Sequence, residues 1–248
     1  MSEILVTKRL TKKFGGLTAL SEVDLEVSKG DIYGIIGPNG AGKTTLFNVV
    51  TGLFFGDHGK IFFDGVDITR IEAHLRIRMG IARTFQNLSF FGKMSVRETV
   101  MVGYLCHTHH GYRSIFCRRQ SAEENKRIED LLLFMGIEKY KGENVINLPI
   151  GDQRKVDMAR ALAGNPKLIL LDEPVSGMTA GEMGTVAEAI RNIRDSGITV
   201  IVVEHNVNFI MSLANHMAVL NFGHRIADGP PREIQQNVEV IEAYLGSE

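Results

Sequence analysis

A glycine-rich stretch near the start of the chain carries residue types that bind phosphate: it runs Gly37-Pro38-Asn39-Gly40-Ala41-Gly42-Lys43-Thr44-Thr45. This spacing matches the pattern G-x-x-x-x-G-K-[ST]. Glycines let successive backbone N–H groups point at one anion, Lys43 adds a positive charge, and the Thr44 hydroxyl is a hard oxygen ligand for Mg²⁺. An apolar run of strand type precedes the loop at residues 32–36, and residues 46–50 are apolar at helical spacing. The loop is therefore predicted to bind a nucleoside triphosphate at the N-terminus of a helix.

Two acids follow a continuous apolar run further along the chain. Residues 168–171 are Leu-Ile-Leu-Leu, which is typical of a strand buried on both faces of a parallel sheet, and Asp172 and Glu173 come directly after it. Ligands collect at the carboxyl edge of such a sheet. There Asp172 could hold Mg²⁺ and Glu173 could polarise the water that attacks a γ-phosphate. Taken alone, an acidic pair after a strand is weak evidence, because helix N-caps look similar.

A histidine and a glutamine complete the set of candidate residues. His205 follows the next apolar run, residues 198–203, so we expect its imidazole at the same edge as the two acids. A single histidine is usually structural, and it is this position that favours a functional role. Gln86 could reach Mg²⁺ or the attacking water, although by itself it would be a surface amide.

The elements that must position these residues belong to an α/β fold. Residues 1–30 alternate as β-strands do, and Asp64-Gly65 between two apolar runs predicts a hairpin, so a small antiparallel sheet is expected beside the main one. The pattern is helical from about residue 87 to residue 165, with two capping boxes that begin at Ser95 and Ser121. The α/β pattern returns after Pro166 and ends in a helix at residues 238–245.

The composition limits the classes of function. The 248 residues carry a formal net charge of −1, which gives no overall field for binding nucleic acid, and we expect no nucleic-acid partner. We find no signal peptide at the start and no apolar run near the roughly 18 residues of a membrane helix. Two cysteines, Cys106 and Cys117, indicate a reducing compartment. We therefore expect a soluble chain that works at a membrane only through a partner.

Taken together and in order, these motifs resemble the ATPase subunit of ABC transporters over essentially the whole chain. The resemblance implies a P-loop NTPase (RecA-like) core of mainly parallel sheet, with an N-terminal antiparallel β subdomain and an inserted helical subdomain. The resemblance assigns residues 1–86 and 166–248 to the two parts of the nucleotide-binding core, and residues 87–165 to the helical subdomain between them. It implies ATP and Mg²⁺ as ligands, and it assigns residues 37–45 to the Walker A loop. By the same resemblance Phe14 stacks on adenine, Gln86 is the Q-loop glutamine, Asp172 is the Walker B aspartate, Glu173 is the catalytic glutamate, and His205 contacts the γ-phosphate.

One segment departs from the family pattern. The signature Leu-Ser-Gly-Gly-Gln is expected before the helix that holds Arg154, and here the chain has Leu148-Pro149-Ile150-Gly151-Asp152-Gln153. Pro149 removes a hydroxyl and a backbone N–H that should meet the γ-phosphate of a partner's ATP. Asp152 suits the helix dipole but opposes an incoming phosphate. The departure is either harmless drift, with Gly151 and Asp152 still binding the partner's nucleotide, or a weakened site.

The sequence around the motifs is most similar to that of the importers of branched-chain amino acids and related amides. This narrower similarity lies in residues 14–20, residues 80–87 and the closing Glu242-Ala243-Tyr244-Leu245-Gly246. The resemblance implies a head-to-tail dimer with a second ABC ATPase, either a paralogue or a copy of this chain. It also implies integral-membrane permease subunits, indirectly a solute-binding protein, and a peripheral position on the cytoplasmic face of the inner membrane. Phe85, Phe90 and Phe91 are candidates to seat a permease helix.

Several related functions stay open. An ATPase of the lipopolysaccharide-export type has the same core, and urea or amide import and an ATP-binding subunit with weak hydrolysis are further alternatives. Two other ABC functions are disfavoured. A chromosome-organising ATPase would need a long coiled coil, but residues 45–148 show no heptads, and a translation-factor ATPase would need two cassettes, but this chain has one. The cluster Cys106-His107-Thr108-His109-His110 fits no closed zinc pattern, so we expect a solvated loop from His107 to Gln120 rather than a metal site.

Overall fold

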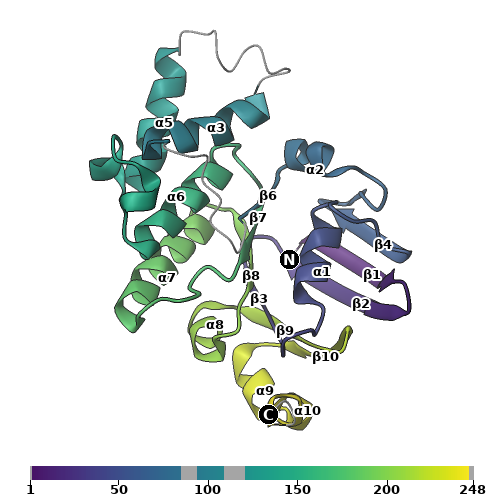
Figure 1. Ribbon diagram of the computed structural model, residues 1–248. Coiled ribbons are helices and arrows are strands. Elements are labelled where there is room, and N and C mark those ends of the chain that lie inside the picture. The colour runs from purple at the N-terminus through teal and green to yellow at the C-terminus, as the bar shows by residue number, and fades with distance from the viewer. Residues whose placement is uncertain (1, 85–93, 109–120, 246–248) are drawn as a thin grey trace.

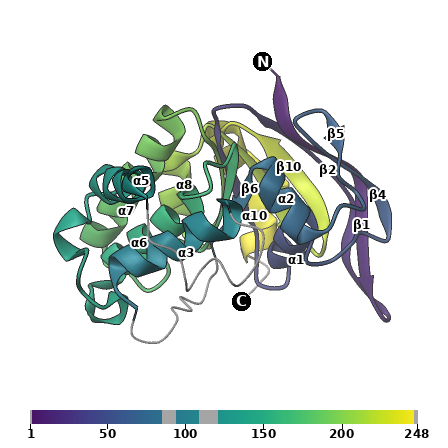
Figure 2. The same cartoon turned by 90° about the horizontal axis from the view of Figure 1, so that it is seen from above.

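The structure is a computed structural model that describes residues 2–84, 94–108 and 121–245. A central sheet separates two regions of different character. In both views the helices α3, α5, α6 and α7 lie on one side of this sheet, and the strands β1, β2 and β4 lie on the other side with α1 (Figures 1 and 2). This arrangement confirms the predicted α/β class, with a second, antiparallel sheet.

The central sheet holds six strands in the order β10-β9-β3-β8-β7-β6. Its strands run parallel except at the β9–β10 edge, where the pairing is antiparallel. Every residue of β3, β7 and β8 is buried, as the apolar runs at residues 168–171 and 198–203 predict. The six strands are β3 (Ile32–Ile36), β6 (Ile81–Arg83), β7 (Leu168–Asp172), β8 (Thr199–Val203), β9 (His216–Asn221) and β10 (His224–Gly229).

The second sheet is antiparallel and has the order β2-β1-β4-β5. Its inward residues alternate with exposed ones along β2, so only one face is buried. Asp64 and Gly65 both have positive φ, 49° and 79°, and they form the predicted turn between β4 and β5. The strands are β1 (Glu3–Phe14), β2 (Leu17–Ser28), β4 (His58–Phe63) and β5 (Val66–Asp67).

The described residues in the middle of the chain form helices that are joined by turns. Both predicted capping boxes form: Ser95 pairs with Glu98, and Ser121 pairs with Glu124. The helices are α3 (Val96–Thr108), α5 (Ala122–Phe134) and α6 (Ile150–Leu162), with short 3₁₀ turns η1 (Glu138–Tyr140) and η2 (Val145–Asn147). The expectation of a loop from His107 was wrong at its start, because α3 continues to Thr108 and the His107 imidazole is half-buried next to Gly164. Residues 109–120 lie outside the described part.

Of the remaining helices, α1, α2, α7 and α8 connect strands, and α9 and α10 follow the last strand. They are α1 (Lys43–Val50), α2 (Ala73–Met79), α7 (Ala180–Asp195), α8 (Val207–Leu213), α9 (Pro231–Gln236) and α10 (Val238–Leu245). Within the described residues, no helix is long and apolar enough to cross a bilayer.

Arg76 of α2 fixes the end of α1, the helix that carries the phosphate-binding loop. The Arg76 side chain is fully buried, and its Nη1 donates hydrogen bonds of 2.7 Å to the carbonyls of Val49 and Val50. Its Nη2 donates to the Ile68 carbonyl, also at 2.7 Å. Burial lowers the pKa of this guanidinium to about 10. Two carbonyls at the end of α1 therefore accept hydrogen bonds from a cation, which suits the helix dipole.

Candidate active site

The candidate residues meet at the carboxyl edge of the central sheet because β3, β8 and β7 end at the same level. Ile35 is in register with Val203, and Val203 is in register with Asp172. Beyond these pairs the Glu173 N–H donates to the Val203 carbonyl at 2.9 Å. The loop after β3, the acids after β7 and the histidine after β8 are thus brought together by the parallel register, as predicted from the sequence.

Two glycines let the phosphate-binding loop pass close to neighbouring backbone. Gly42 precedes α1 with a φ of 102°, and a Cβ there would lie 2.5 Å from the Ala19 carbonyl oxygen. Gly37 has a φ of 152°, and a Cβ there would lie 2.1 Å from the Leu220 carbonyl oxygen. Either glycine could be replaced only if β2 or β9 moved, so the shape of the loop is set by the strands around it.

Lys43 places its ammonium inside the loop. Its Nζ donates to the Gly37 carbonyl at 2.5 Å and to the Pro38 carbonyl at 2.9 Å. Burial lowers the pKa of Lys43, while the nearby carboxylates of Glu173 and Asp172 raise it. The ammonium thus lies between the loop and the acids, where it can pair with phosphate oxygens.

Glu173 and His205 are in direct contact. Glu173 Oε1 lies 2.5 Å from His205 Nε2, and the carboxylate is buried whereas the imidazole is exposed. Glu173 has a φ of 47°, a conformation that is uncommon for residues other than glycine and that costs backbone energy. Such strain is often found at functional sites, and here it aims the carboxylate across the end of β8 at the imidazole.

Asp172 is held by an arginine to which sequence reasoning gave no role. Arg83 Nη2 lies 2.7 Å from Asp172 Oδ2, and Arg83 Nη1 donates to Asn48 Oδ1 at 2.5 Å. The guanidinium also lies over the Phe47 ring, 5.6 Å from its centroid. The ion pair is almost completely buried and joins β6 to β7, and the hydrogen bond to Asn48 extends the contact to α1. The position of Arg83 three residues before Gln86 was the available signal.

Glu204 is a second residue that the sequence gave no reason to select. Its carboxylate accepts hydrogen bonds from the backbone N–H groups of Val175 at 2.9 Å and His205 at 3.0 Å. Burial raises the pKa of Glu204, the backbone hydrogen bonds lower it, and the nearby Glu173 raises it further. Glu204 therefore fixes the segment after Glu173 and the backbone of His205 from below the site.

Lys43, Glu173 and His205 line one cavity of about 550 Å³, whereas Asp172, Arg83 and Glu204 lie behind its wall. Phe14 lies on its wall, 43% exposed, with its ring edge-on to Phe54 at a centroid distance of 5.5 Å. Leu17 and Phe222, which sequence reasoning missed, also line the cavity. The remaining lining residues are Thr18, Ala19, Asn39, Gly40, Ala41, Gly42, Lys43, Thr44, Thr45, Glu173 and His205.

Comparison with known proteins identifies the family. The sequence profile described as "ABC transporter" matches residues 20–176, and a second profile, "Branched-chain amino acid ATP-binding cassette transporter", matches residues 224–248. The chain belongs to the ABC transporter family. The resemblance seen in the sequence is thereby confirmed, and the chain is an ABC-type ATPase.

Full-length relatives include ATP-binding proteins of branched-chain amino acid transport and of lipopolysaccharide export. The chain is 34% identical to the high-affinity branched-chain amino acid transport ATP-binding protein BraF of Pseudomonas aeruginosa, covering 98% of each chain. It is 36% identical to the lipopolysaccharide export system ATP-binding protein LptB of Escherichia coli K12, again over 98% of each. Among solved structures, the ADP conformation of MJ1267, an ATP-binding cassette of an ABC transporter, has a TM-score of 0.88 and 32% identity over 99% of this chain and 100% of that one.

The segment at which the ABC signature is expected, residues 148–153, does not line this chain's own Walker A cavity. Pro149 precedes the first turn of α6 and makes no side-chain cap, while Asp152 lies in that turn with its Oδ1 3.4 Å from Lys155 Nζ. Neither Gly151 nor Asp152 is among the residues that line the cavity. Gln86, Phe85, Phe90 and Phe91 lie outside the described residues, so their assigned positions stay predictions.

Thr44 and Asp172 supply oxygen donors that fit Mg²⁺, and of the two only Thr44 lines the cavity itself. The Thr44 hydroxyl is exposed in the cavity, and Asp172 supplies a carboxylate with one oxygen held by Arg83. Both are oxygen donors of the kind that Mg²⁺ prefers. When bound with ATP, the ion would neutralise charge on the phosphates.

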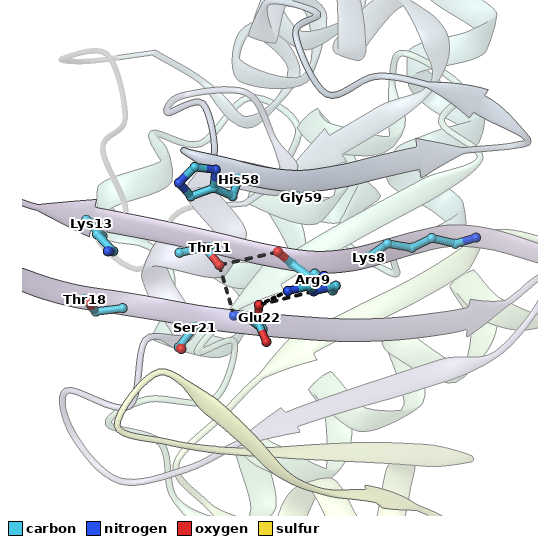
Figure 3. A pocket seen from close by; sticks show the side chains of 9 residues that line it. All are labelled: Lys8, Arg9, Thr11, Lys13, Thr18, Ser21, Glu22, His58 and Gly59. Carbon is cyan, nitrogen blue, oxygen red and sulfur yellow. Dashed lines mark hydrogen bonds and ion pairs between the residues drawn. The ribbon is translucent and has the colours of Figure 1, made fainter.

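A second hollow lies on the antiparallel sheet of this ABC protein. Figure 3 shows Arg9 of β1 and Glu22 of β2 side by side, joined by an ion pair, with His58 above them. Arg9 and Glu22 both have positive φ, and the Arg9 N–H donates to Asp24 Oδ1 at 2.6 Å across a register shift. The acid and the base neutralise each other at the surface, which is typical of a solvated groove beside a β-bulge.

Proposed function

We propose that this chain is the ATP-hydrolysing subunit of an importer for branched-chain or other hydrophobic amino acids. The main support for the ATPase site is the cavity that Lys43, Thr44 and Glu173 line together. In it, Glu173 pairs with His205 at 2.5 Å. The full-length similarity to BraF and the C-terminal match at residues 224–248 support the substrate class.

We assign parts in hydrolysis to the loop, Lys43, Thr44, Glu173 and His205 of the cavity, and to Asp172 and Gln86 outside its lining. The loop N–H groups and Lys43 bind the β- and γ-phosphates, and Thr44, Asp172 and Gln86 would hold Mg²⁺, which would neutralise phosphate charge. Glu173 polarises the water that attacks the γ-phosphate. His205 keeps the Glu173 carboxylate oriented and contacts the γ-phosphate.

The chain acts as half of a head-to-tail dimer at the cytoplasmic face of the inner membrane. Gly151 and Asp152 lie outside this chain's own cavity, which supports their completing the ATP site of a partner. Because Pro149 and Asp152 weaken that contribution, we favour a paralogue with a standard signature as the partner. The partner's site would then be slow, and the site bounded by Glu173 and His205 would be fast.

Exposed apolar side chains on α2 and in the segment after α1 support contact with a permease. Leu75 and Ile77 of α2 are 41% and 40% exposed, and α2 ends one residue before β6, which leads toward Gln86. Leu53, Phe54 and Phe55, which follow α1, are also exposed. Substitution of these residues should weaken assembly with the permease more than ATP binding.

Lipopolysaccharide export is the second candidate, and the 36% identity to LptB favours it. The two proposals differ in the cargo that the assembled transporter moves. We would co-express the chain with the permease subunits, binding protein and second ATPase encoded near its gene, and reconstitute the complex in liposomes. ATP-dependent uptake of leucine that is lost in Glu173→Gln would support the importer. Release of lipopolysaccharide without leucine uptake would contradict it.

A further inference from the structure

Phe222 occupies an unusual place in the β9–β10 hairpin. The turn consists of Phe222 and Gly223, with φ values of 44° and 80°. Two-residue turns with positive φ at both positions favour Asn-Gly or Asp-Gly, because a bulky side chain is strained in this region. Phe222 is also 82% exposed, the highest value among the large apolar side chains of the described residues. An exposed aromatic ring is thus held where a small polar residue would be more stable.

The turn is attached to the two segments that form the nucleotide site. The Gly223 N–H donates to the Ala41 carbonyl of the Walker A loop at 3.0 Å. The Gly223 carbonyl accepts from the Ser21 N–H of β2 at 2.8 Å. A Cβ at Gly223 would lie 2.8 Å from the Ala19 carbonyl oxygen, so the contact with β2 is close. These contacts fix the Phe222 backbone relative to the loop that binds phosphate.

Two hairpin tips from different sheets contribute apolar side chains to the same cavity. Phe14 and Leu17 flank the β1–β2 turn, and Phe222 forms the β9–β10 turn. Their exposed fractions are 43%, 67% and 82%, so each presents apolar surface that the fold itself leaves uncovered. The part of the cavity that binds phosphate is polar. The aromatic base of ATP therefore suits the apolar side chains, and its charged phosphates suit the polar part.

We propose that Phe222 is a second base-contacting residue, which binds the purine together with Phe14. The inference rests on the nucleotide site described above and adds a residue to it. Aromatic side chains stabilise a base through its π-face, which every base has. Because Phe222 offers no hydrogen-bonding group, its contribution should be equal for ATP and GTP and zero for inorganic tripolyphosphate.

The test uses the full chain and the substitution Phe222→Asn. Asparagine tolerates positive φ and suits this turn, so the variant removes the ring without straining the hairpin. Affinities for ATP, GTP and tripolyphosphate would be measured by calorimetry. We expect ATP and GTP to bind about ten- to a hundred-fold more weakly and tripolyphosphate to bind unchanged. Phe222→Trp should bind both nucleotides at least as tightly as the wild type.

Leu133→Ala is the matched control, since Leu133 is a 65% exposed apolar side chain of α5, which contributes no residue to the cavity. It should leave all three affinities unchanged. If Phe222→Asn bound ATP as tightly as the wild type while Phe14→Ala bound it more weakly, the role of Phe222 would be overturned and that of Phe14 would stand. An equal loss for tripolyphosphate would also overturn it, because the effect would then act through Ala41 on the loop. Failure of the wild type to bind either ATP or tripolyphosphate would instead refute the nucleotide site.

Discussion

Arg83 Nη2 lies 2.7 Å from Asp172 Oδ2 in an ion pair that is almost completely removed from solvent. The pair joins the end of β6 to the end of β7, and through Asn48 it also reaches α1. The acid assigned to Mg²⁺ is therefore oriented by a cation on the strand that leads to the Q-loop.

Removing this cation should destabilise the fold. In Arg83→Met the Asp172 carboxylate stays buried without its partner, and the free energy of unfolding should fall by about 3–5 kcal/mol. Urea unfolding without nucleotide would measure the change. Lys60→Met removes a cation from an exposed pair with Asp67 and should cost less than about 1 kcal/mol. Equal effects of the two substitutions would show that the Arg83–Asp172 pair contributes little.

The buried carboxyl group of Glu204 should make the free energy of unfolding depend on pH. Burial raises its pKa in the folded state above the ordinary value of 4.5. Between that value and the raised pKa the folded chain binds more protons than the unfolded chain, so Glu204 makes stability fall as pH rises through this window. Glu204→Gln should remove this part of the slope in urea unfolding from pH 4.5 to pH 8. Glu188→Gln, on the exposed face of α7, should keep the wild-type slope. A Glu204→Gln profile that is parallel to the wild type would refute the prediction.

Lys43 should act on binding of ATP rather than on turnover alone. Lys43→Ala removes the ammonium that lies beside Gly37 and Pro38 in the loop, and with it a charge-assisted contact to the phosphates. Charge-assisted hydrogen bonds contribute about 1.5–3 kcal/mol, so ATP affinity should fall by roughly ten- to a hundred-fold. Calorimetry with ATP would measure it. ATP affinity equal to that of the wild type would mean that the loop N–H groups suffice.

The altered signature predicts low activity of the chain on its own. A homodimer would contain two weak signatures, so the purified chain should bind ATP and hydrolyse it slowly. The double substitution Pro149→Ser with Asp152→Gln should raise the steady-state rate by roughly ten- to a hundred-fold, as expected for one regained charge-assisted hydrogen bond. A purified chain that is already a fast ATPase, with a rate that the double substitution leaves unaltered, would support harmless drift instead.

The parts of the fold that depend on local pattern could be predicted from the sequence. The buried strands β7 and β8, the Asp64-Gly65 turn and the two capping boxes each depend on a few neighbouring residues. The Arg83–Asp172 pair could not be predicted in this way, because the two residues are 89 positions apart and meet only when β6 pairs with β7.

Phe222 was missed for a different reason. Turn rules favour asparagine at its position, so an aromatic residue there gives no recognisable pattern. Only the contacts of Gly223 with Ala41 and Ser21 place the ring at the cavity. The segment around Gln86 lies outside the described residues, and its role stays a prediction.

Single-turnover hydrolysis of ATP by Glu173→Gln, with the chain in excess over ATP, tests the central claim most directly. The glutamine keeps the shape of the side chain beside His205 but polarises water poorly. The variant should bind ATP as tightly as the wild type and elute as a dimer with ATP, and its hydrolysis should be at least about 100-fold slower. Hydrolysis at the wild-type rate would mean that another residue prepares the water, and it would contradict the assignment of the Glu173–His205 pair as the catalytic centre.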